Sequence, residues 1–297
     1  MAGLAKKAAL VIGASRGIGE QIAVTLAKNG YCVGVSAKTV TDSKKTPGTI
    51  YSVSEKIKSE GGQALPILCD VRNHDHISKA VDDCIQEFGH LDAVVYNAGA
   101  ILWKSVIETP MKRFDLMLDV NVRGAYALVQ KVLPYFLERK AGHILLVSPP
   151  IYSRFFKGKT PYSITKVGMS VLVQGLAMEL ENTGVGISTL WPATVIESQV
   201  TVIQDTPPSL MRKADIFADA TLQILQEPPE RYSGQTLIDE DLLIEAGFTD
   251  MAKYRCDPER EPPRMMPKKF PSLLVEEQDV NLNLLHYMNE QKEKSKL

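Results

Sequence analysis

Gly13-Ala14-Ser15-Arg16-Gly17-Ile18-Gly19 is the stretch of sequence that decides the fold of this chain. It follows the apolar run at 8–12 and opens a helical pattern that extends from Ile18 to Lys28. In such a turn Gly13 takes the backbone angles of a tight turn, Gly17 lets the backbone approach a diphosphate, and Gly19 lets the helix lie close on the strand. Free N–H groups at the start of the helix would face the phosphates. Because glycine spacing alone is a weak signal, a turn without a ligand is the alternative.

Composition describes an ordinary soluble globular protein of 297 residues, 44% hydrophobic and 23% charged, with a formal net charge of -1. That charge argues against nucleic acid or an anionic membrane as a partner, so a small-molecule substrate is expected. No apolar run approaches the roughly 18 residues of a membrane helix, so no transmembrane segment is expected, and a first strand near residue 8 leaves no room for a presequence. No CxxC spacing or metal site is present, and buried free thiols in a reducing compartment are expected for Cys32, Cys69, Cys84 and Cys256.

Apolar strands alternate with helical patterns from residue 8 to about 240. This alternation predicts an α/β protein with a Rossmann-type doubly wound parallel sheet, right-handed crossovers and helices on both faces. We expect one domain over residues 1–254, followed by an arm over 255–297. The predicted strands cover 8–12, 31–35, 64–69, 91–96, 143–147 and 186–191.

The end of the second predicted strand, Ser36-Ala37-Lys38, is where the ribose of a dinucleotide would lie. An acidic residue there would accept hydrogen bonds from the ribose of NAD, whereas a cation would pair with the extra phosphate of NADP. Lys38, with Arg16 in the glycine turn, therefore favours NADP. Solvated surface cations are the alternative.

Two further strand ends carry candidate ligand-binding residues. After the third strand, Asp70 could accept a hydrogen bond from an adenine amine with Val71 against the ring, or it could be a turn-forming Asp. After the fourth, the small residues Asn97-Ala98-Gly99 leave space for a ligand at the edge where open α/β sheets bind.

Two predicted helices carry polar side chains that are candidates for a functional role. Asn121, in the interior of one helix, either sits at a local kink or holds a water through its side chain. Tyr162 and Lys166 are four residues apart and share one face of another helix. A cation close to the phenol would lower the pKa of Tyr162 toward working pH and make it a proton donor or acceptor for a carbonyl or alcohol. A solvated helix pair is the alternative.

In this order the motifs resemble the short-chain dehydrogenase/reductase family, and most closely its hydroxysteroid dehydrogenase-like branch, over residues 6 to 250. The branch resemblance rests on segments such as Ala37-Lys38-Thr39 and Trp191-Pro192. It implies Tyr162 as acid and base, Lys166 as pKa modulator and ribose ligand, and Asn121 as holder of a proton-relay water. It also implies a homo-oligomer.

Two segments depart from the family pattern. The family's catalytic Ser, about 13 residues before the Tyr, falls here on Pro149. Ser148, one residue early, is the candidate, and the alternatives are that Tyr152, Ser153 or no residue takes the role. After the sixth strand, Pro192-Ala193-Thr194 replaces the usual Pro-Gly, which leaves open the backbone group that holds the nicotinamide amide. The segment from Ile196 to Arg212 is expected to cover the substrate pocket.

The arm over 255–297 is rich in proline and then polar, with one short amphipathic helix expected. Longer members of the branch resemble fusions to a sterol-carrier domain, for which this chain has no length. Its final residues, Ser295-Lys296-Leu297, are a receptor-read peroxisomal address. The expected location is therefore the peroxisome, or the cytosol if the tripeptide is not recognised.

These observations predict an NADP-dependent oxidoreductase that acts on a carbonyl or secondary alcohol of a lipid-derived substrate, fatty acyl or steroid-like. NAD is the less favoured cofactor. The alternative, motivated by Pro149, is a catalytically weak NADP-binding protein that serves interaction or sensing.

Overall fold

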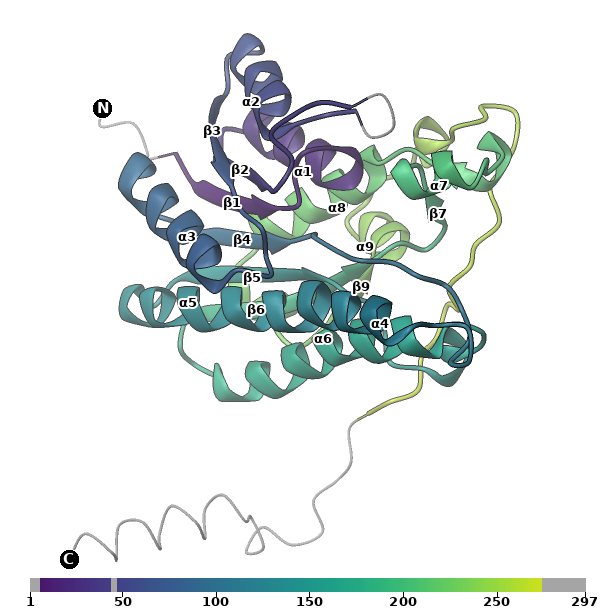
Figure 1. Ribbon diagram of the computed structural model, residues 1–297. Helices are drawn as coiled ribbons and strands as arrows, with labels where there is room; N and C mark the ends of the chain where they lie inside the picture. Colours follow the sequence, from purple (N-terminus) through teal and green to yellow (C-terminus); the bar gives the residue numbers. More distant parts are fainter. Residues whose placement is uncertain (1–5, 44–46, 274–297) are drawn as a thin grey trace, which may run out of the picture.

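The computed structural model describes residues 6–43 and 47–273. Its centre is a parallel seven-stranded sheet in the order β3-β2-β1-β4-β5-β6-β9 (Figure 1). The predicted doubly wound α/β fold is thus confirmed. β9 was not predicted, since three residues are too few to show a period. The strands are β1 (Ala8–Ile12), β2 (Cys32–Ala37), β3 (Gln63–Leu68), β4 (Ala93–Tyr96), β5 (Gly142–Val147), β6 (Val185–Trp191) and β9 (Thr236–Ile238).

Helices cover both faces of the sheet because successive strand side chains point to opposite sides. Val11 packs in a core with α1 (Gly17–Lys28), α2 (Ile50–Ser59), α8 (Asp215–Gln226) and α9 (Asp239–Glu245). Its neighbour Ile12 packs on the other face with α3 (His74–Phe88), α5 (Gly124–Arg139) and α6 (Thr160–Glu179). Strands buried on both faces explain why the sequence shows continuous apolar runs there rather than alternation.

Shorter elements connect these helices and strands. They are α4 (Met111–Met117), the π-helical turn η1 (Leu118–Arg123), the 3₁₀ turns η2 (Ser153–Phe156), η3 (Pro208–Leu210), η4 (Pro229–Tyr232) and η5 (Ala252–Tyr254), the helix α7 (Gln199–Ile203), and a small parallel pair of β7 (Val195–Ile196) with β8 (Met211–Arg212).

Two composition-based expectations meet the structure here. All four cysteines are free thiols, and three are buried as expected, but Cys256 is only half-buried because it lies in the arm. Within residues 6–43 and 47–273, no helix combines the length and the apolar character that crossing a bilayer requires.

Candidate active site

The glycine turn joins β1 to α1 with the contacts that its spacing predicts. Gly13 has φ +87°, and a Cβ there would lie 2.7 Å from the backbone nitrogen of Ala98. A Cβ on Gly19 would overlap the Gly13 carbonyl oxygen and stand 2.6 Å from Nδ2 of Asn97. Gly17, at φ +56°, has open space around it and is required for its backbone angle alone.

A cavity of about 390 Å³ runs along the carboxyl edge from this turn. The predicted cofactor residues at the ends of β1, β2, β3 and β4 line it together. Gly19 lies behind the turn, and Tyr162, Lys166 and Pro192 lie farther along the edge. The lining residues predicted from sequence are Gly13, Ser15, Arg16, Gly17, Ile18, Lys38, Asp70, Val71, Asn97, Ala98 and Gly99.

Sequence reasoning missed other residues of this cavity. Leu116 and Val120 reach it from α4 and η1, and Ser198, Gln199 and Val200 reach it from the start of α7. The last three fall within the segment 196–212 that was expected to cover the pocket. The first two carried no signal, since apolar residues on a helix face are usually core.

Charges in this cavity are unequal. Arg16 and Lys38 both line it, and Arg16 donates to the carbonyls of Pro47 and Gly48 at 3.1 and 2.9 Å. Asp70 accepts a hydrogen bond from Nε of Arg72 at 2.9 Å and another from the Arg72 backbone at 3.1 Å. Asp70 is therefore turn-forming, which is one of the two alternatives that the sequence left open. The Arg72 guanidinium holds the pKa of Asp70 down at about 2.

Tyr162 lies near the start of α6 in a small apolar cluster. It is 3% exposed, and the rings of Phe155 and Trp103 lie with their centres 6.4 Å from its ring. No described residue bonds its phenol oxygen. Burial raises the pKa of Tyr162 above its ordinary value, because phenolate is poorly solvated there.

Lys166 is buried one turn further along α6. Its ammonium donates to the Val147 carbonyl at 2.7 Å and lies next to Gly99, where a Cβ would stand 3.7 Å away. Burial lowers the pKa of Lys166 to about 7. The prediction that Lys166 lowers the pKa of Tyr162 is therefore wrong for this structure, because burial acts on both groups and the ammonium is turned to a carbonyl.

Asn121 lies within the π-helical turn η1, so the predicted kink is present. Its amide oxygen accepts from the backbone of Ala100 at 2.8 Å, and its amide nitrogen donates to the Ala100 carbonyl and to the Thr165 hydroxyl at 3.0 and 2.9 Å. Both amide protons are used, so the side chain ties η1 to the β4 edge and to α6. The amide oxygen accepts one hydrogen bond and has a second lone pair, so the expected role of Asn121 in holding a water stays a prediction.

Ser148 does not present its hydroxyl to the site. The residue is fully buried, and its hydroxyl donates to the Lys166 carbonyl at 2.9 Å and shares a short hydrogen bond with Ser170. Tyr152 is also engaged, with its hydroxyl 3.3 Å from Sδ of Met266. The geometry corrects the catalytic expectation for Ser148 to the backbone-bonding alternative, because the residue after it is a proline and the chain turns its hydroxyl toward α6.

The segment after β6 is held by its backbone. The Ala193 N–H donates to Asp239 at 2.8 Å, and its carbonyl accepts from the backbone of Met265 and Met266. Pro192 has no N–H. The hydroxyl of Thr194 is buried and has no hydrogen-bond partner among the described residues.

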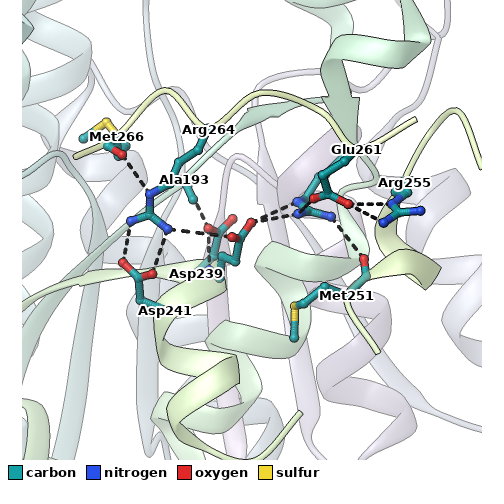
Figure 2. A network of polar contacts seen from close by, with 10 residues as sticks. Ala193, Asp239, Asp241, Met251, Arg255, Glu261, Arg264 and Met266 are labelled. Carbon is teal, nitrogen blue, oxygen red and sulfur yellow. Dashed lines mark hydrogen bonds and ion pairs between the residues drawn. The ribbon is translucent and has the colours of Figure 1, made fainter. Parts of the chain in front are cut away.

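The first part of the arm packs on the domain rather than extending from it (Figure 2). Arg264 forms a bidentate pair with Asp241 at 2.7 and 2.5 Å, and the 2% exposed Arg212 bridges Glu240 and Glu261. Residues 255–273 therefore pack beside the end of β6, where Met266 is buried with Ala193 and Ile238. The expected amphipathic helix and the terminal tripeptide lie outside the described residues.

This geometry defines a class of protein, an oxidoreductase that holds a nicotinamide dinucleotide along the carboxyl edge of a doubly wound sheet. The chain belongs to the short chain dehydrogenase family, whose model matches residues 7–205. When bound, the cofactor supplies the hydride, and the chain supplies a protonated phenol at Tyr162 beside a buried amine at Lys166.

Known relatives agree with this assignment. Hydroxysteroid dehydrogenase-like protein 2 of Homo sapiens is 40% identical over 252 residues, which are 84% of this chain and 60% of that protein. The chain thus spans about 60% of the length of the curated relatives that it matches. The crystal structure of a putative dehydrogenase from Xanthomonas campestris matches with TM-score 0.81 and 38% identity, over 91% of this chain and 98% of that one.

Two more distant structures differ in cofactor. A 7 alpha-hydroxysteroid dehydrogenase complexed with NADH and 7-oxo glycochenodeoxycholic acid matches with TM-score 0.64 and 26% identity, over 78% of this chain and 92% of that one. A metagenomic short-chain oxidoreductase in complex with NADP matches with TM-score 0.63 and 25% identity, over 78% of this chain and 96% of that one.

Proposed function

We propose that the chain is an NADP-dependent oxidoreductase that transfers hydride between the nicotinamide and a carbonyl or secondary alcohol of a lipid-derived substrate. The observation that carries this proposal is the unbonded phenol of Tyr162 in an apolar cluster. Its raised pKa keeps the phenol protonated, as a donor to a carbonyl oxygen must be. Turnover of NADPH with a panel of long-chain ketones, oxo acids and oxo steroids tests it, with Tyr162→Phe as the inactive control.

The preference for NADP rests on charge. Arg16 and Lys38 line the cavity where β2 ends, and Asp70, the acid in its lining, is already paired with Arg72. Titration of NADP and NAD against the protein and against Lys38→Asp tests this. We expect tighter NADP binding and a swing toward NAD in the variant; equal binding of both cofactors by the unmodified chain contradicts it.

A lipid-derived substrate is supported by the apolar surroundings of Tyr162, which include Met117 and Phe155. The names of two matched proteins point the same way, one a hydroxysteroid dehydrogenase-like protein and one a hydroxysteroid dehydrogenase. A panel that turned over only small polar ketones would exclude this class.

A catalytically weak NADP-binding protein is the second candidate. The engaged hydroxyl of Ser148 favours it, since no serine donor aims at the carbonyl. Cofactor binding without turnover of any substrate in the panel would select this alternative.

We also propose residence in the peroxisome through recognition of Ser295-Lys296-Leu297 by the import receptor. Removal of Leu297 should leave the protein in the cytosol, and an unchanged distribution in cells contradicts the idea.

A homo-oligomer is proposed from the exposed apolar residues Ile164, Val171 and Met178 on α6. Light scattering on the purified chain tests it.

A further inference from the structure

Lys159 lies immediately before α6, three residues ahead of Tyr162, and is half-buried. Its ammonium stands 4.2 Å from the centre of the Phe155 ring and 5.8 Å from that of Trp103. Those are the two rings that lie against Tyr162. A positive charge is therefore built into the aromatic wall of the candidate active site.

This charge lacks an acidic partner among the described residues. Between Glu138 and Glu179 the sequence contains no Asp or Glu, whereas Arg154 and Lys157 lie close to Lys159 along the chain. Burial lowers the pKa of Lys159, and no counter-charge offsets that effect. Ring faces stabilise a cation only partly, so the site has unused capacity for an anion.

The same wall continues into an exposed apolar segment that runs from the end of β4 to the first residue of α4. Trp103, Val106, Ile107 and Met111 all lie there, and Ile107 is 98% exposed. A substrate that covered this segment would need a hydrocarbon part. An aliphatic chain on these residues and an anion on Lys159 together describe an amphiphile.

We propose that Lys159 binds the carboxylate of an aliphatic oxo or hydroxy acid whose reacting carbon lies at Tyr162. This rests on the proposed oxidoreductase function and narrows its substrate class. Lys159 and Tyr162 lie against the same two rings, so a carboxylate bound by Lys159 stands a few bonds from a carbon that reacts at Tyr162. Lys159 is a specificity-determining residue and takes no part in proton transfer.

Steady-state kinetics with a straight-chain γ-oxo acid and its methyl ester test the inference. Lys159→Met keeps the apolar stem and removes the charge, so KM for the acid should rise about tenfold while KM for the ester stays unchanged. Lys159→Arg should restore binding of the acid. Lys157→Met, a neighbouring exposed lysine without ring contacts, is the matched control and should leave both substrates unaffected.

Binding without turnover separates this inference from the proposed function. Decanoate should quench the fluorescence of Trp103, and decanol should not. The quenching should be absent in Trp103→Phe. In Lys159→Met the affinity for decanoate should be about tenfold lower. If decanoate and decanol bind alike, or Lys159→Met binds decanoate normally, the inference is overturned. If decanoate binding depends on Lys159 but no oxo compound is turned over with either cofactor, the oxidoreductase proposal fails and the anion site stands.

Discussion

The glycine turn, which follows β1, and the packed arm, which lies beside β6 and β9, are held by different forces. At 13–19 the backbone of α1 meets the backbone of β1 and Ala98, and steric exclusion of any Cβ defines the shape. At 255–273 buried and half-buried ion pairs, centred on Arg212 and Arg264, fasten the arm (Figure 2). The turn should therefore respond to added volume and the arm to changes of charge.

The largest effect on stability is expected from pH, through Asp239 at the start of α9, beside the packed arm. Burial raises the pKa of Asp239 to about 7, so the folded chain retains a proton that the unfolded chain releases above its ordinary value of 3.8. Stability contributed by this group is complete below that value and is lost as pH rises to about 7. Asp239→Asn keeps the acceptor for Ala193, so its advantage over wild type should grow from pH 5 to pH 8, up to about 4 kcal/mol. Urea unfolding at several pH values measures this, and parallel curves for both proteins would remove Asp239 from the explanation.

Added volume at the glycine turn comes next. Gly19→Ala should destabilise the fold by about 3 kcal/mol and abolish cofactor binding, because its Cβ overlaps a backbone carbonyl that cannot move. Gly175→Ala, inside α6 with open space at its Cβ, is the matched control and should gain about 0.5 kcal/mol. Thermal unfolding and NADPH titration decide between them. A Gly19→Ala protein that binds NADPH normally would show that steric exclusion does not define the glycine turn.

Removal of a charge at the arm should have a smaller effect. Arg212→Met leaves Glu240 with Arg264, at 3.8 Å, and Glu261 with Arg255, and the loss of the buried cation should lower stability by about 2 kcal/mol. The described part of the arm should also become sensitive to protease. Arg255, whose acidic partner among the described residues is Glu261, supplies the control: Arg255→Met should change stability by less than about 1 kcal/mol. Equal effects of the two variants would show that burial of Arg212 is irrelevant.

The smallest effect on stability is expected at Ser148, which belongs to neither the glycine turn nor the arm. Its hydroxyl bonds the Lys166 carbonyl and Ser170, so Ser148→Ala should lower stability by about 1 kcal/mol while kcat stays near the wild-type value. Activity and melting temperature should be measured on the same preparation. A drop in kcat of about a hundredfold would return Ser148 to the catalytic residues.

The sequence by itself determined the sheet, the glycine turn and the spacing of Tyr162 and Lys166. These depend on contacts between residues close in the chain, and local periodicity and glycine placement report such contacts directly. The positions of six strands along the chain could be predicted for the same reason. Asp70 and Asn121 could be identified as candidate site residues, but the sequence left two possible roles open for each.

Tertiary structure alone decided how those candidates are used. The pKa values of Tyr162 and Lys166 depend on burial by other elements, and the direction of the Ser148 hydroxyl depends on where α6 passes. The arm is fastened by Arg212, which reaches acids 28 and 49 residues away and looks in sequence like a surface cation. Desolvation and long-range pairing are properties of the assembled chain, and no local pattern encodes them.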